Sequence, residues 1–318
     1  MTPEFFITRH NELIDPFVQV WSWQIPVYLF LGGWVAGMMI ITGYFMLGGR
    51  HVRRSPLLSA LPGVGLVLLS LGMLALFLDL EHKRYVWRLY TTFQWTSPMS
   101  WGSWILLLVY PALVVTWMVR PPALLEDLSQ TVARASRALQ ANRELVRAIG
   151  ITSMVLGVAL GVYTGILLSS LGARPLWNSG VLGVLFLASG VSAAAAFAHL
   201  VTRSPDERAL TVRIDNVVLA SELGILALFM FGLLAGSAPQ VEAARLFLGG
   251  SYTAPFWVFV VGLGIVIPLI IQILAARHFV QHTPIAPLMV MAGGLALRWV
   301  IVSAGQVSHW AHGVMGSY

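Results

Sequence analysis

The sequence predicts an all-α integral membrane protein. Hydrophobic residues fill 58% of its 318 positions and charged residues only 10%, whereas soluble domains carry about 25% charged residues. Eight apolar runs are each long enough for a bilayer core, which needs about 20 residues per helix. Backbone groups in lipid must bond within their own segment, so we expect these runs to be helices. We therefore expect residues 1–318 to form a single polytopic membrane domain.

The expected spans follow one another closely and are predicted to form two four-helix bundles. They cover residues 24–47, 59–79, 102–120, 149–171, 181–202, 214–236, 254–276 and 284–304. Segment 122–147 places apolar side chains near helical spacing opposite Arg and Glu, which predicts an amphipathic helix on the membrane surface. Six aromatic residues between 85 and 101, Tyr90 among them, predict an interfacial belt.

The distribution of basic residues predicts topology and not a nucleic-acid-binding surface. The net charge is +6, but the excess lies in arginine clusters between apolar runs. Twelve basic residues follow the first, third, fifth and seventh spans, and six lie on the other side. Cytoplasmic loops carry the excess of Arg and Lys, so we expect both termini outside, on the periplasmic side. We therefore expect the chain to interact with the lipid bilayer and not with nucleic acid.

The absence of cysteine limits the redox chemistry of the chain. Without thiolates it can neither bind an iron–sulfur cluster through cysteine nor attach a c-type haem. No histidine falls in the middle of a span, so haem b lacks its two facing ligands, and no metal-ligand cluster stands out. We expect no haem, no iron–sulfur cluster and no metal in this chain. A redox role would need a diffusible cofactor or centres on another chain.

Polar residues gather near the expected outer ends of three spans and in the adjoining connections. They are Gln24, Tyr28, Asp79, Glu81, His82, Tyr163 and Arg174. Such residues suit an amphipathic ligand such as a quinone, whose carbonyl oxygens need donors, whose protons need a relay and whose tail needs an apolar cleft. Tyr28 or Tyr163 could supply the donor, and Asp79 the relay. The structural alternative is that Asp79 and Glu81 only cap a helix end.

Ionisable residues also lie inside later spans, where they are costly and usually functional. Glu222 lies in the sixth span and Arg298 in the eighth, with depths that differ by roughly 9 Å at 1.5 Å per residue. They form either a buried structural ion pair or part of a proton path. Asp215, expected at the interface, is a third candidate for that path. A proton-conducting or transporter subunit is therefore an alternative function.

Several stretches together resemble the NrfD/polysulfide-reductase membrane-subunit family over about residues 20–306. Each motif is weak alone, but their order and spacing are specific. The matching stretches are WQIPVYLFLGG (23–33), TSPMSWGS (96–103), YTGILLS (163–169), RPLWN (174–178), Glu222, Leu297-Arg298 and AGQ (304–306).

The resemblance implies a quinone- or quinol-reactive anchor of a respiratory oxidoreductase complex in a bacterial inner membrane, active only with its partners. It implies menaquinone or ubiquinone as cofactor, a ferredoxin-like iron–sulfur subunit as partner and, through that subunit, a molybdopterin catalytic subunit or a multihaem cytochrome. In the family pattern, Gln24 and Tyr28 take the positions that contact the quinone head group. Tyr163 takes that of the fourth-helix tyrosine, and Asp79 the acidic position.

Two departures from the family pattern leave roles open. Many members have Gly-Arg-Pro after the acidic position, whereas this chain reads DLEHKR over 79–84, so Asp79, Glu81 and His82 remain alternative proton-handling groups. A histidine often proposed as a quinone ligand in the polysulfide-reductase branch is replaced by Tyr28. A purely structural anchor that holds electron-transfer subunits without touching quinone is a further alternative.

Overall fold

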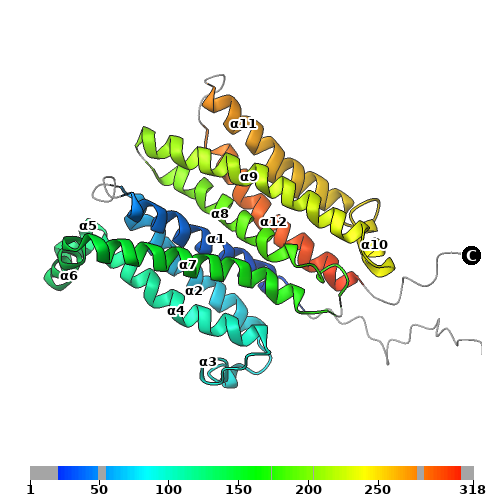
Figure 1. Cartoon of the computed structure of the whole chain (residues 1–318), viewed down its shortest axis with the longest axis horizontal. Coiled ribbons are helices and arrows are strands. Elements are labelled where there is room, and N and C mark those ends of the chain that lie inside the picture. Colours follow the sequence, from blue (N-terminus) through cyan, green and yellow to red (C-terminus); the bar gives the residue numbers. More distant parts are fainter. Residues whose placement is uncertain (1–20, 49–54, 173, 203, 278–282, 309–318) are drawn as a thin grey trace, which may run out of the picture.

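The computed structural model is a bundle of helices, eight of which are long and apolar enough to cross a membrane (Figure 1). It describes residues 21–48, 55–172, 174–202, 204–277 and 283–308, and these ranges contain no β-strand. The predicted all-α membrane fold is therefore confirmed. The division into two four-helix bundles and the side of the membrane on which the termini lie stay predictions.

The long helices lie close to the expected apolar runs. They are α1 (Gln24–Leu47), α2 (Leu57–Asp79), α4 (Pro98–Val119), α7 (Arg143–Ser169), α8 (Val181–Val201), α9 (Pro205–Leu234), the π-helix η2 (Pro255–Val266) continued by α11 (Ile267–Ala276), and α12 (Ile285–Val307). Helices α7 and α9 begin well before the expected apolar runs, which start at residues 149 and 214. The Asn142 side chain caps α7, and Pro205 with two acidic residues opens α9, both features that favour a helix N-terminus.

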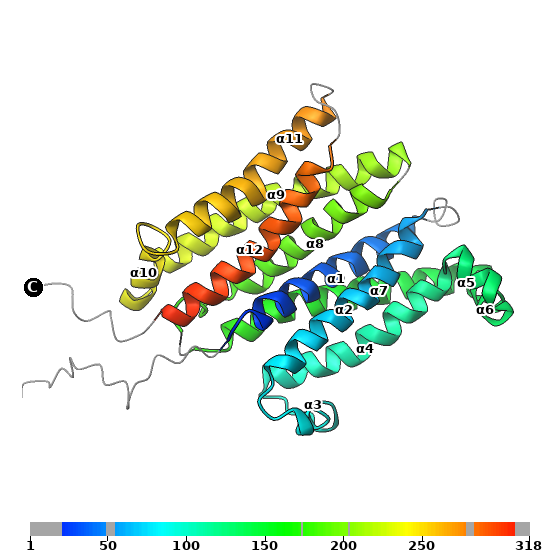
Figure 2. The same ribbon diagram turned by 180° about the vertical axis from the view of Figure 1, so that it is seen from behind.

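Short helices lie at the two ends of the bundle (Figures 1 and 2). Helices α3 (Arg88–Thr91) and α10 (Ala238–Arg245) lie at one end of the bundle, which we call the α3 end. The short helix η1 (Lys83–Tyr85) directly precedes α3 in the chain. Helices α5 (Ala123–Leu128) and α6 (Gln130–Ala141) lie at the opposite end, which we call the α6 end. The expected surface segment 122–147 is therefore helical but broken, because the backbone is extended at Ser129 and Asn142.

Helix α6 closes the end of α4. Ser136 Oγ and Gln140 Nε2 both donate to the carbonyl of Val119, the last residue of α4, at 3.3 and 2.8 Å. The last carbonyls of a helix lack partners within the helix, so these side chains satisfy one of them. The polar face of α6, with Arg134 and Arg137, stays exposed.

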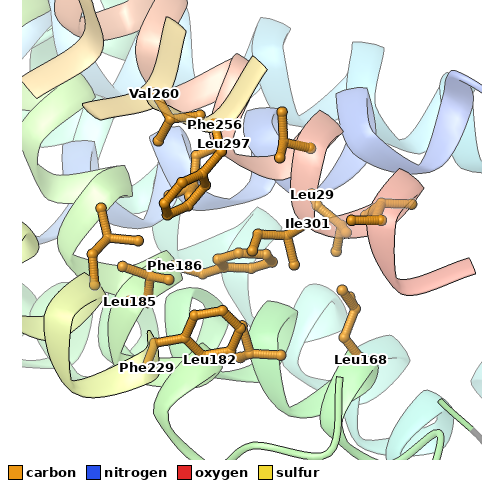
Figure 3. Packing of buried hydrophobic residues seen from close by; sticks show 14 of the residues in the cluster. Leu29, Leu168, Leu182, Leu185, Phe186, Phe229, Phe256, Val260, Leu297 and Ile301 are labelled. Carbon is orange, nitrogen blue, oxygen red and sulfur yellow. The ribbon is translucent and has the colours of Figure 1, made fainter. Parts of the chain in front are cut away.

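Helix α1 is central, since it packs against α2, α7, α8 and α12. Its contact with α8 brings two backbones together: a Cβ at Gly190 would overlap the carbonyl of Gly33, and one at Gly37 that of Gly190. Glycine is required at these positions, as in other close helix pairs in membranes. Beside this contact, Leu29, Phe186 and the residues shown in Figure 3 form a buried apolar cluster from α1, α7, α8, α9, η2 and α12.

Candidate functional site

Two buried tyrosines meet inside the bundle, in the half nearer the α3 end. Tyr28 of α1 is 3% exposed and Tyr163 of α7 is 6% exposed, and their hydroxyl groups interact with each other. The Tyr163 ring lies directly on α4 at Gly102, and Gly72 of α2 faces the Tyr28 ring. Four helices therefore enclose the pair, whose members the sequence placed at comparable depth in the first and fourth spans.

A third phenol, Tyr90 of α3, adjoins the pair. Ser103 Oγ lies 2.7 Å from the carbonyl of Leu89 in α3 and 2.8 Å from that of Ser100 in its own helix, and its single proton is shared between these two acceptors. This contact joins α3 to α4. Tyr90 is half-buried and interacts electrostatically with both buried tyrosines. Burial, and to a lesser degree the neighbouring Tyr110, raises the pKa of Tyr90, so this phenol stays a neutral donor at physiological pH.

The sequence assigned Tyr90 only to an aromatic belt. Its position depends on how the connection between α2 and α4 folds back, which no periodicity encodes. Ser103 was the available signal: it lies in TSPMSWGS, a stretch singled out for other reasons, and its hydroxyl fixes the position of α3.

The polar groups expected around the tyrosines differ in how they lie. Gln24 begins α1 one turn before Tyr28, and its Oε1 is buried without a partner among the described residues. Asp79 is half-buried at the end of α2, on the same face as Gly72 but about 10 Å farther along the helix at 1.5 Å per residue. Glu81 and His82 are exposed.

Arg174 lies in the connection between α7 and α8. Its Nη1 donates to the carbonyl of Ser308 at 3.2 Å, just beyond α12. Trp177 of the same connection donates from Nε1 to the carbonyl of Ile301 at 2.9 Å and stacks on Trp21. These contacts fasten the connection between α7 and α8 to the end of α12.

Arg298 is fully buried where α1, α8 and α12 meet. Its guanidinium donates four hydrogen bonds, three of them to backbone carbonyls, and the Phe30 and Phe186 rings flank it. The acceptors are Leu29 O (3.3 Å, from Nε), Ser189 Oγ (3.0 Å) and Gly294 O (2.8 Å, both from Nη1) and Phe186 O (2.8 Å, from Nη2). A fixed fork of donors is the property that arginine brings to such a site.

Two buried carboxylates of α9 lie on the helix face turned towards Arg298. Glu222, 3% exposed, interacts with the Ser189 hydroxyl and electrostatically with Arg298. Asp215, 1% exposed, accepts hydrogen bonds from Ser192 Oγ at 2.7 Å and Gln272 Nε2 at 2.6 Å. The side chain of Asp215 is enclosed between α8 and α11, and its expected position near the membrane interface stays a prediction.

A metal site is not evident in the part of the chain that the structure describes. No group of three or more His, Asp or Glu residues gathers there. Most of the histidines lie outside the described residues: His10, His51, His278, His282, His309 and His312.

Comparison with known proteins gives the family. The family model "Polysulphide reductase, NrfD" matches residues 8–309. Protein NrfD of Escherichia coli is 32% identical over 91% of this chain and 96% of its own length. The C component of polysulfide reductase from Wolinella succinogenes is 29% identical over 90% and 94%. The C component of tetrathionate reductase from Salmonella typhimurium is 25% identical over 72% and 62%.

These matches agree with the eight apolar helices. Together they identify a multi-pass protein of a bacterial inner membrane, as predicted. The chain belongs to the NrfD/polysulphide reductase family of membrane subunits.

Proposed function

We propose that this chain is the quinone-reactive membrane subunit of a respiratory reductase complex. The observation that supports this most strongly is the pair of neighbouring phenols Tyr28 and Tyr163, buried near the unpartnered Oε1 of Gln24. Phenols donate to quinone carbonyls, and an amide oxygen accepts from a quinol hydroxyl, so the residues present fit both redox forms. Menaquinone or ubiquinone would supply two-electron, two-proton chemistry when bound.

The residues around the pair have separate roles in this proposal. Tyr28 and Tyr163 hold the head group and orient it. Asp79 ends α2 on the side of the α3 end, and Tyr90 and the exposed Glu81 and His82 lie at that end, where these groups pass protons to water. With both termini outside, that end faces the periplasm.

The proposed partners follow from the names of the relatives. The polysulfide reductase and tetrathionate reductase relatives are each named as one component of a reductase. A protein without cysteine needs redox centres elsewhere, so we place a ferredoxin-like iron–sulfur subunit at the α3 end. That subunit would connect the quinone to a molybdopterin catalytic subunit or a multihaem cytochrome.

A binding measurement on the purified complex tests the site. Heptylhydroxyquinoline N-oxide, a fluorescent quinone-site inhibitor, should bind with saturable quenching. Gln24→Ala should weaken that binding about tenfold, because a hydrogen bond of about 1.4 kcal/mol is lost. Gln130→Ala, at the start of α6, should leave the affinity unchanged. Absence of saturable binding in the wild type would refute the proposed site.

A proton path through the later helices is a second candidate function, supported by the burial of Asp215 and Glu222. Both carboxylates are enclosed and linked by serine hydroxyls or Gln272 to their neighbours, an arrangement that suits a relay. Arg298, interacting with Glu222, would control its charge.

Substitution of the two carboxylates tests the proton path. In proteoliposomes that contain the complex and a pH-sensitive dye, Glu222→Gln and Asp215→Asn should each lower the rate of proton transfer by about a hundredfold, the lower end of the effect of a positioned proton-transfer group. Inhibitor affinity should not change. Glu242→Gln, which removes an exposed carboxylate paired with Arg245, is the control. Wild-type proton transfer in both variants would exclude the path.

A further inference from the structure

We propose that Gly102 is a positioning residue for the Tyr163 phenol, an inference that rests on the proposed quinone site. Gly102 is buried in α4, and a Cβ built on it would overlap both Cζ and the hydroxyl oxygen of Tyr163. The phenol therefore occupies the volume that any side chain at position 102 would fill. Tyr163 can hold its place against α4 only because residue 102 has no side chain.

The atoms around Gly102 distinguish this role from ordinary helix packing. At Gly37 and Gly190, the atom nearest the added Cβ is a backbone carbonyl oxygen of the neighbouring helix, as expected where two backbones approach each other. At Gly102 the three nearest atoms all belong to the Tyr163 side chain. Glycine here accommodates a functional side chain from another helix.

The same turn of α4 also places the third phenol. Ser103 follows Gly102 directly, and its hydroxyl donates to the carbonyl of Leu89, the residue before Tyr90. Position 102 thus sets where Tyr163 lies, and position 103 sets where α3 lies above it. Reactions that depend on positioned groups lose up to about a hundredfold when a group moves by 1 Å, so a side chain at 102 affects the site strongly.

A double-mutant cycle in the full complex tests the role of Gly102. Gly102→Ala should weaken binding of heptylhydroxyquinoline N-oxide and lower quinol turnover by about tenfold or more, since it displaces the Tyr163 phenol. In a Tyr163→Ala background the same substitution should have no further effect, because no ring remains to be displaced. Gly224→Ala in α9 is the matched control, as its Cβ would meet nothing within 4 Å.

Thermal unfolding of the same variants separates this inference from the proposed function. Alanine favours a helix more than glycine does, so Gly102→Ala would not lower the Tm through helix propensity. We expect a lower Tm in the wild-type background and none in the Tyr163→Ala background. That difference would report the overlap of the added Cβ with the Tyr163 ring. If the wild type binds no inhibitor, the proposed quinone site fails while this pattern of Tm values still holds. Equal losses of Tm and affinity in both backgrounds would overturn the role of Gly102.

Discussion

Arg298→Met is expected to lower the stability of the folded protein by about 3–5 kcal/mol, the cost typical of removing one partner of a buried charged network. The substitution removes all four donated hydrogen bonds. It also leaves the buried Glu222 carboxylate without the nearby guanidinium. Because the acceptors belong to α1, α8 and α12, we expect these helices to lose their fixed arrangement.

The measurement is the thermal midpoint of the detergent-purified protein together with its yield from membranes. The thermal midpoint of Arg298→Lys should lie between those of Arg298→Met and the wild type, since lysine keeps the charge but not the planar fork of donors. Arg134→Met, on the exposed face of α6, controls for the loss of an arginine. Adding Glu222→Gln to Arg298→Met should recover part of the loss by removing the unpaired charge. A wild-type midpoint for Arg298→Met would contradict the stabilising role of Arg298.

The arrangement around Arg298 shows what the sequence could not predict. Burial of a charge in a span was evident, and so was Glu222 as its acidic neighbour. The assumed depths of Glu222 and Arg298 differed by roughly 9 Å at 1.5 Å per residue. In the structure, however, the Ser189 hydroxyl lies beside both side chains. Three of the four acceptors are backbone carbonyls, which every residue type carries, so no side-chain pattern could reveal them.

The tyrosine site was predictable in part for a similar reason. Tyr28 and Tyr163 lie inside long apolar helices whose ends can be read from composition, and their depths could therefore be compared. Tyr90 and Gly102 became relevant only through packing. Tyr90 lies on a connection that a contact of Ser103 joins to α4. Gly102 shows its role only when α7 lies against α4. The burial of Asp215 depends on the packing of α9 against α8 and α11, which bring Ser192 and Gln272 to its carboxylate.

The double substitution Tyr28→Phe and Tyr163→Phe is expected to lower quinol oxidation by the complex at least about a hundredfold, the lower end of the effect of positioned proton donors. Phenylalanine keeps both rings, so the contacts with Gly72 and Gly102 remain and the fold is retained. Only the two hydroxyl groups are lost, and with them the interaction between the two side chains. Each single substitution should have a smaller effect, because the remaining phenol still reaches the head group.

The comparison with Asp79→Asn then separates binding from proton transfer. The double Phe variant should lose inhibitor affinity as well as turnover, since the phenols contact the head group. Asp79, about 10 Å from Gly72 along α2 at 1.5 Å per residue, should affect turnover and not affinity. Tyr44→Phe, an exposed tyrosine of the same helix as Tyr28, controls for the loss of a hydroxyl. Wild-type turnover in a protein that carries Tyr28→Phe, Tyr163→Phe and Asp79→Asn together would refute the assignment of the quinone site to these three residues.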